Sequence, residues 1–231
     1  MALVWTERIS AMSSTSLAVC GNSSLTIIPD LPWRLNLNFD GATGYLVGEA
    51  NKGLNYMFTF MNFARLGTGL QGLAHSELAF QNSLAYSRDR LQMRSLTGPK
   101  NPSGPADPII VHPDVRRMLM LMRSTNEAMR AIAYVTGADL DRHHKSPEKE
   151  DRDAAIARVD LLTPVIKGWC TEMSQELTSL GIQVHGGMGY AKEYHVERLL
   201  REVMIARLAP VSPQLILCNI AEKALGLPKS Y

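Results

Sequence analysis

The sequence is poor in cysteine, in long apolar runs and in net charge, and each scarcity excludes a class of protein. Its three cysteines lie far apart without Cys-x-x-Cys spacing, so we expect neither a disulfide framework nor a metal site. No stretch approaches the ~18 consecutive apolar residues of a membrane span. A net charge of +2 favours neither nucleic acid nor a polyacidic partner. We therefore expect a cytoplasmic protein with no membrane span and no nucleic-acid partner.

What the sequence has is helical periodicity over most of its length. Apolar residues recur at three- and four-residue steps, the spacing of one helix face. This spacing predicts helices at residues 54–92, 115–141, 156–180, 196–206 and 215–225. Five prolines between residues 97 and 113 make that stretch a loop, and the charged residues 142–153 predict a solvated turn. The expected fold is mainly α, an antiparallel four- or five-helix bundle.

A small β element is expected before the bundle. Residues 35–39 alternate apolar and polar side chains, as a strand with one buried face does. Residues 40–44 predict a turn, and residues 45–47 a second short strand. Residues 1–34 show no clear periodicity, so we expect an irregular N-terminal segment.

The most informative motif is the run of residues 181–190, GIQVHGGMGY. Its glycines remove Cβ atoms where a backbone or a ligand comes near, and Gln183 can both donate and accept hydrogen bonds. On its own, such a run also fits an ordinary glycine-rich helix end. Together with residues 193–201, EYHVERLLR, it resembles the C-terminal helical domain of FAD-dependent acyl-CoA dehydrogenases.

The resemblance covers residues 35–208 and implies a division of the chain. An irregular segment at 1–34 would precede a remnant of the family's middle β-domain at 35–50. The C-terminal helical domain would occupy 51–208, and a tail would follow at 209–231. Most of the family's β-domain and its N-terminal domain have no counterpart here, so we expect a truncated or recombined chain.

The resemblance also assigns a partial FAD site shared across a subunit interface. In the family, residues matching Arg90, Gln92, Gln183, Gly186 and Gly187 receive the FAD of the neighbouring subunit. A guanidinium such as that of Arg90 suits a pyrophosphate. The cluster Arg88, Arg90 and Arg94 also fits a solvated helix end beside its dipole. A shared site implies a homodimer or tetramer.

Arg65 matches a family arginine near the acyl-CoA tunnel, which makes it a candidate substrate-binding residue. The alternative for a mid-helix arginine is a surface position with only its aliphatic stem buried.

The carboxylate base that the family's chemistry requires is not found at either family position. Removal of an α-proton from an acyl thioester needs a carboxylate beside that carbon. One position holds Ala64, and the other falls at residues 209–211, Ala-Pro-Val. Glu193, Glu197 and Glu202 lie nearby, but their helical positions predict solvated side chains. We assign no catalytic residue and expect the chain to be inactive alone.

Three functions remain open from the sequence. The first is part of an acyl-CoA dehydrogenase, an oxidoreductase of acyl-CoA and fatty acid metabolism. The second is a non-catalytic oligomerisation module that pairs with an intact acyl-CoA dehydrogenase. The third is a helical bundle without any link to flavin. Bound flavin would favour the first, and co-purification with a full-length dehydrogenase would favour the second.

Overall fold

The computed structural model describes residues 3–4, 25–27, 35–37, 45–46, 48–208 and 211–229. The chain divides into two units, residues 1–61 and residues 62–231. Each unit is described by itself below.

Short strands make up the first unit's regular structure before its helix. β1 (Leu3–Val4) pairs antiparallel with β4 (Tyr45–Leu46), and β2 (Leu25–Ile27) pairs antiparallel with β3 (Leu35–Leu37). The two strands predicted from alternation therefore form, but each takes a partner from the N-terminal segment in place of the other. The predicted turn at residues 40–44 lies outside the described residues.

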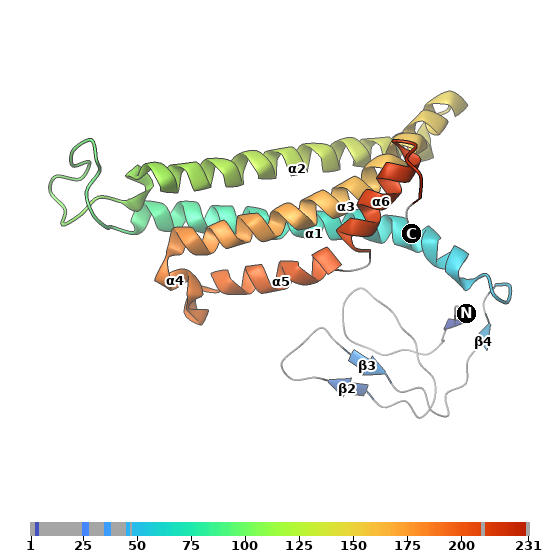
Figure 1. The fold of residues 1–231 in the computed structure, drawn as a ribbon, viewed down its shortest axis with the longest axis horizontal. Helices are drawn as coiled ribbons and strands as arrows, with labels where there is room; N and C mark the ends of the chain where they lie inside the picture. Colours follow the sequence, from blue (N-terminus) through green and yellow to red (C-terminus); the bar gives the residue numbers. More distant parts are fainter. Residues whose placement is uncertain are drawn as a thin grey trace. The chain divides into compact units, whose positions relative to one another are not determined.

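Helices form the second unit, as the periodicity predicts (Figure 1). The long helices are α1 (Gly53–Asp89), α2 (Pro113–Lys145) and α3 (Lys149–His185), and the shorter ones are α5 (Val196–Leu208) and α6 (Pro213–Lys223). A helical turn, α4 (Gly187–Tyr190), and two 3₁₀ turns, η1 (Ile109–Val111) and η2 (Lys192–Tyr194), complete the described elements. The prediction of a mainly α bundle is confirmed.

The solvated turn predicted at residues 142–153 is wrong in extent. α2 continues to Lys145 and α3 begins at Lys149, so the connection is short. Ion pairs at i,i+4 spacing, Lys145–Asp141 and Lys149–Asp153, run along the ends of both helices. Such pairs stabilise a helix whose charged face points to solvent. The charged sequence that predicts a turn therefore forms the ends of two helices.

α1 and α3 approach each other through small residues. A Cβ at Gly72 would lie 2.9 Å from the carbonyl oxygen of Cys170, and one at Gly69 would lie 2.5 Å from Cγ2 of Ile166. Ser76 and Ala79 continue the same face of α1 and are fully buried. Since side chains of this size leave little between the helices, the two backbones pack almost directly on each other.

The hydrophobic core fills the space between α1, α2, α3 and α5. Met122, Met129, Ile166 and Leu177 are buried there. Trp169 is half-buried and packs against this core. The run at residues 118–122 is apolar throughout, but Met120 and Leu121 are exposed, so α2 has one solvent face there.

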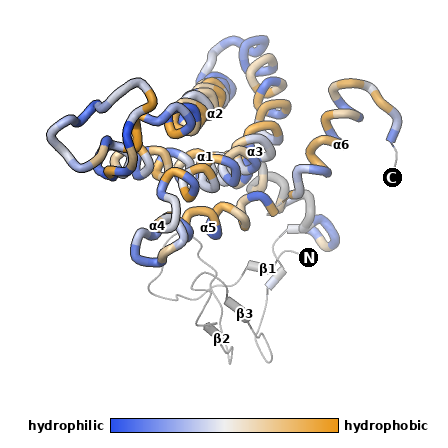
Figure 2. Tube along the Cα trace, turned by 60° about the vertical axis from the view of Figure 1, so that its left-hand side comes forward, coloured by the Kyte–Doolittle hydropathy of each residue, from blue (hydrophilic) through white to orange (hydrophobic). Residues whose placement is uncertain are grey.

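α6 carries apolar residues along much of its length (Figure 2). Ile216 packs inward, whereas Leu215 and Leu217 are exposed. Among the described residues, no single helix reaches both the length and the hydropathy of a membrane span. The bent pair α5 and α6 passes that test only when its two helices are taken together.

Candidate functional site

A hollow of about 540 Å³ opens where α1 and α3 end. Five of the six predicted site residues line it, from two segments far apart in the sequence. They are Arg90, Gln92, Gln183, Gly186 and Gly187. The side chains of Arg90, Gln92 and Gln183 are exposed, so they are available to a ligand or to another chain.

The chain after α1 is held in place by backbone hydrogen bonds. Gln92 N–H donates to the Asp107 carbonyl and Asp107 N–H donates to the Met93 carbonyl, each at 2.9 Å. The Arg90 carbonyl accepts from Ile109 N–H at 2.9 Å. These bonds hold the end of the loop beside its start, and they fix the positions of Arg90 and Gln92 at the hollow.

The loop between α1 and α2 is organised around the buried carboxylate of Asp107. It accepts hydrogen bonds from the N–H groups of Ser95 at 2.8 Å, Asn101 at 2.7 Å and Lys100 at 3.0 Å. Arg94 donates to it and to two loop carbonyls. These donors, that of Ser95 first, lower the pKa of Asp107 to about 2. A proline-rich loop without regular structure is thereby fixed.

The glycines of the motif have different reasons to be glycine. Gly186 ends α3 with φ of 60° and ψ of −137°, a conformation that residues with a Cβ rarely adopt. A Cβ at Gly189 would lie 2.6 Å from the carbonyl oxygen of Ile182. At Gly187 a Cβ would meet nothing within 4 Å. Within the described chain, neither backbone conformation nor packing requires glycine at position 187.

His185 and Tyr86 form the aromatic wall of the hollow. Their rings stack with centroids 4.3 Å apart, and Tyr194 meets Tyr86 edge-on. His185 is 6% exposed, and its Nδ1 lies 2.8 Å from the carbonyl oxygen of Gly181. Burial lowers the pKa of His185. The ring is therefore neutral at physiological pH.

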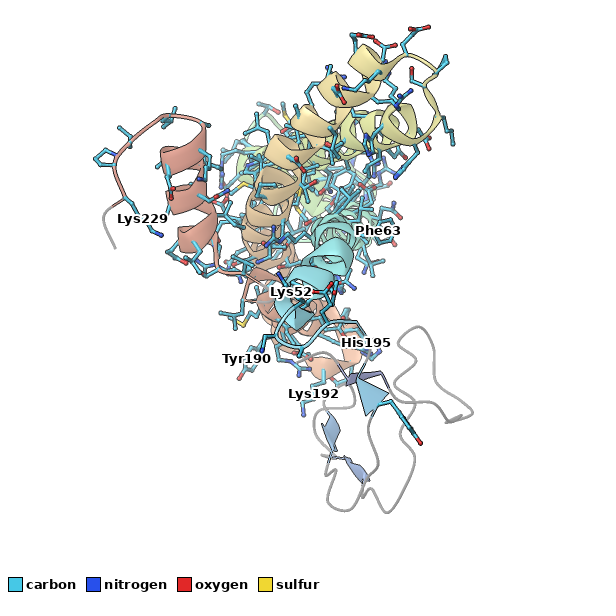
Figure 3. All side chains as sticks on the ribbon, turned by 90° about the vertical axis from the view of Figure 1, so that its right-hand side faces the viewer. Lys52, Phe63, Tyr190, Lys192, His195 and Lys229 are labelled. Carbon is cyan, nitrogen blue, oxygen red and sulfur yellow. The ribbon has the colours of Figure 1, made fainter. Side chains whose placement is uncertain are left out.

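The charges around the hollow favour an anion. Arg90 is a permanent cation, and the remaining polar lining consists of amides, two histidines and a tyrosine. Among the described residues that line it, there is no Asp or Glu. Beyond the hollow, Tyr190 and Lys192 extend outward from the connection between α3 and α5 (Figure 3).

Arg65 lies away from the hollow, in the first half of α1. It is half-buried, and its charge contributes, after burial itself, to lowering the pKa of Lys167. The Lys167 ammonium is fully buried and donates to the carbonyls of Arg207 and Val211. Arg65 therefore belongs to the region where α5 ends, and its predicted role in substrate binding is separate from the hollow.

Several residues of this end of the molecule were not found from the sequence. His112 and Met93 line the hollow, but neither stands in a recognisable spacing. Glu202, expected to be solvated, is half-buried and lies 3.2 Å from His75 of α1. Position 210, at one of the two family positions for the base, lies outside the described residues.

Residues 51–224 match the family model described as "Acyl-CoA dehydrogenase, C-terminal domain", which is most of the chain. The chain belongs to the acyl-CoA dehydrogenase family. The family consists of FAD-dependent oxidoreductases.

Relatives within the family are similar over the same part of the chain. A 3-methylmercaptopropionyl-CoA dehydrogenase of Ruegeria pomeroyi is 47% identical over 175 residues, covering 76% of this chain and 29% of the relative. A butyryl-CoA dehydrogenase of Syntrophomonas wolfei is 34% identical over 174 residues, covering 73% and 28%. The chain thus spans less than a third of the length of these two relatives.

Solved structures share the fold. An acyl-CoA dehydrogenase of Bacillus anthracis complexed with FAD superimposes with a TM-score of 0.68 at 24% identity, covering 83% of this chain and 32% of that one. The butyryl-CoA dehydrogenase of Megasphaera elsdenii gives a TM-score of 0.58 at 22% identity, covering 78% and 40%. At this level of identity, the likeness concerns the fold alone.

Proposed function

We propose that this chain supplies half of an FAD site that a second subunit completes, as part of an acyl-CoA dehydrogenase. The observation that carries the proposal is the meeting of Arg90 and Gln92 with Gln183, Gly186 and Gly187 around one hollow. The two segments are far apart in the sequence, and only the fold brings them together. A homodimer or tetramer follows from a site divided in this way.

The residues present fit an FAD pyrophosphate. Arg90 offers a charge-assisted hydrogen bond, the amides of Gln92 and Gln183 can add neutral ones, and no carboxylate of the described lining opposes an anion. Gly187 supports the same reading, because a close approach from outside the chain would account for the absent Cβ. When bound, FAD accepts the hydride that leaves the acyl thioester in this family.

The half-site is tested by titrating the chain with ADP, which is the adenosine and pyrophosphate part of FAD. We expect binding that weakens as salt concentration rises, since it depends on the charge of Arg90. Calorimetry or ligand-observed NMR would measure it. No binding at millimolar ADP in low salt would contradict the half-site.

We further propose that the chain alone does not oxidise acyl-CoA. Of the two family positions for the base, one holds Ala64 and the other falls at Pro210, and neither side chain can accept a proton. Glu202, a half-buried carboxylate of α5, is engaged by Arg198 and His75. The pKa of Glu202 is lowered, with burial opposing the effect of these two partners.

Anaerobic mixing with FAD and a range of acyl-CoA thioesters tests this second proposal. We expect the flavin to remain oxidised, and its visible absorbance to remain unchanged. Bleaching by any thioester would show that a base is present at a position other than the two family positions.

The alternative is a non-catalytic module that assembles with an intact acyl-CoA dehydrogenase. Exposed apolar side chains favour an assembly, and Phe63 of α1 is 75% exposed. Co-expression with a full-length dehydrogenase distinguishes the two functions. A stable mixed oligomer without any flavin held by this chain's hollow would support the module.

The compartment we propose is the cytoplasm. Cys170 is buried and Cys218 is half-buried, and both are free thiols. Free thiols fit a reducing compartment.

A further inference from the structure

One polar group of the hollow has a fixed hydrogen-bonding direction. The carbonyl oxygen of Gly181 can only accept, so Nδ1 of His185, 2.8 Å away, carries the proton of the neutral ring. In that tautomer Nε2 holds a lone pair and acts only as an acceptor. Stacking on Tyr86 holds the plane of the ring.

Nε2 of His185 is the nitrogen left for a ligand. It makes no hydrogen bond with any residue in the described part of the chain, and the ring lines the hollow. The described residues do not enclose Nε2, so water can reach it in the free protein, and a ligand group that donates to it takes the place of that water. Protonation does not provide a ready alternative, because burial lowers the pKa of His185.

The other polar groups of the hollow are different in kind. The guanidinium of Arg90 only donates, and the amides of Gln92 and Gln183 can turn either way. Across the hollow, His112 Nε2 lies 3.0 Å from the carbonyl oxygen of Gln92, so it donates there. The hollow therefore offers donors for anionic oxygens together with a fixed acceptor at His185.

We infer that His185 determines specificity in this hollow by accepting a hydrogen bond, through Nε2, from a hydroxyl or amino group of the bound nucleotide. The inference rests on the proposed FAD half-site and adds a requirement to it. The ligand must carry an O–H or N–H donor near its phosphates, as a sugar hydroxyl or a base amino group does. Inorganic pyrophosphate has neither of these groups, and once it is fully ionised at alkaline pH it has no O–H to donate to His185.

The decisive experiment is ¹⁵N NMR of the wild-type chain with labelled histidine. In the free protein we expect the His185 proton on Nδ1 and a bare Nε2. At a pH where the phosphates are fully ionised, addition of ADP should move the Nε2 resonance toward the protonated position, while inorganic pyrophosphate leaves it in place. Purine-riboside diphosphate, which lacks the amino group, and 2′,3′-dideoxy-ADP, which lacks both sugar hydroxyls, then separate the two sources of the donor.

Each outcome decides between the inference and the proposal beneath it. If ADP binds and the Nε2 resonance does not move, the role of His185 is rejected and the half-site stands. A proton found on Nε2 in the free protein also rejects the role. If ADP does not bind at all, the half-site and the inference fail together.

A variant provides a second measurement. His185→Phe keeps a ring to stack on Tyr86 and removes the acceptor. We expect about 5- to 10-fold weaker binding of ADP, the effect of one hydrogen bond, and unchanged binding of pyrophosphate. His144→Phe, at an exposed position near the end of α2, is the control and should bind both as the wild type does. Equal affinity of His185→Phe and wild type for ADP would overturn the inference.

Discussion

Glycine occurs both in the contact between α1 and α3 and at the hollow where these helices end, but its surroundings differ between the two regions. In the contact, Gly69 and Gly72 stand where a neighbouring helix leaves no room for a Cβ. At the hollow, Gly187 stands in open space. In the contact, glycine is therefore required by packing within the chain. At the hollow, we attribute glycine to a partner from outside the chain.

The polar groups of the two regions differ in the same way. Ser76, Thr171 and Thr178 are fully buried between helices, and their hydroxyls donate to carbonyls of their own helix. Arg90, Gln92 and Gln183 are exposed. Substitutions in the contact should therefore change the stability of the fold, and substitutions at the hollow should change binding.

The largest effect is expected from Gly72→Ala. The added Cβ would lie 2.9 Å from the carbonyl oxygen of Cys170 and 3.1 Å from its carbon, and backbone atoms cannot turn aside as a side chain can. We expect a loss of about 1–3 kcal/mol in the free energy of unfolding, as for other overpacked cores. Urea denaturation followed by circular dichroism measures it.

Gly67→Ala on the same helix is the matched control. A Cβ there meets nothing within 4 Å, so the higher helix propensity of alanine acts alone. We expect a gain of about 0.5–1 kcal/mol. Equal effects of the two substitutions would mean that the close contact does not limit the packing of α1 on α3.

Arg90→Gln is expected to leave the fold intact and weaken binding. Its side chain is exposed, so the free energy of unfolding should change by less than about 0.5 kcal/mol. Loss of a charge-assisted hydrogen bond to phosphate should weaken ADP binding about tenfold and reduce its salt dependence. Isothermal titration calorimetry at two salt concentrations measures both.

Arg88→Gln sharpens this result, since Arg88 is also exposed but does not line the hollow. It should bind ADP as the wild type does. If both variants lose affinity to the same extent, the binding depends on the general charge of the helix end and the hollow is not its site.

Features of the fold that depend on interactions between residues close in the sequence could be predicted, and those that depend on distant residues could not. Helices follow from local periodicity, and the bundle was therefore predictable from residues 54–92, 115–141 and 156–180. The ends of α2 and α3 were not, because their charged residues form helix in place of turn. Strand pairing was also missed, since short strands choose partners by contacts that a local pattern does not record.

The residues of the candidate site also fall into those that motifs predict and those that only the fold brings together. The family motifs located five residues of the hollow, but sequence alone could not place His112 or Tyr86 beside them. Asp107 was hidden in a proline-rich stretch, because its role depends on N–H groups that the folded loop brings together. Contacts of this kind are made by the fold and leave no spacing to recognise.

The smallest effect is expected from Asp107→Asn, and it tests whether the loop beside the hollow depends on a buried charge. The folded pKa of Asp107, about 2, lies below its ordinary value of 3.8. The carboxylate therefore stabilises the loop above about pH 4, and this stabilisation is lost as the pH falls toward 2. Asparagine offers fewer acceptor sites to Ser95, Lys100 and Asn101, and its NH₂ group would face donors.

We expect the amides of Ser95 and Asn101 to exchange faster with solvent in the Asp107→Asn variant at neutral pH, with the bundle amides unchanged. The difference from wild type in melting temperature should shrink between about pH 4 and pH 2 as the wild-type carboxylate is protonated. Ser103→Ala, an exposed change in the same loop, should show neither effect. A melting-temperature difference that stays constant down to pH 2 would mean that the charge of Asp107 does not hold the loop. Its neighbours Gln92 and Met93 would then owe their place at the hollow to the backbone bonds alone.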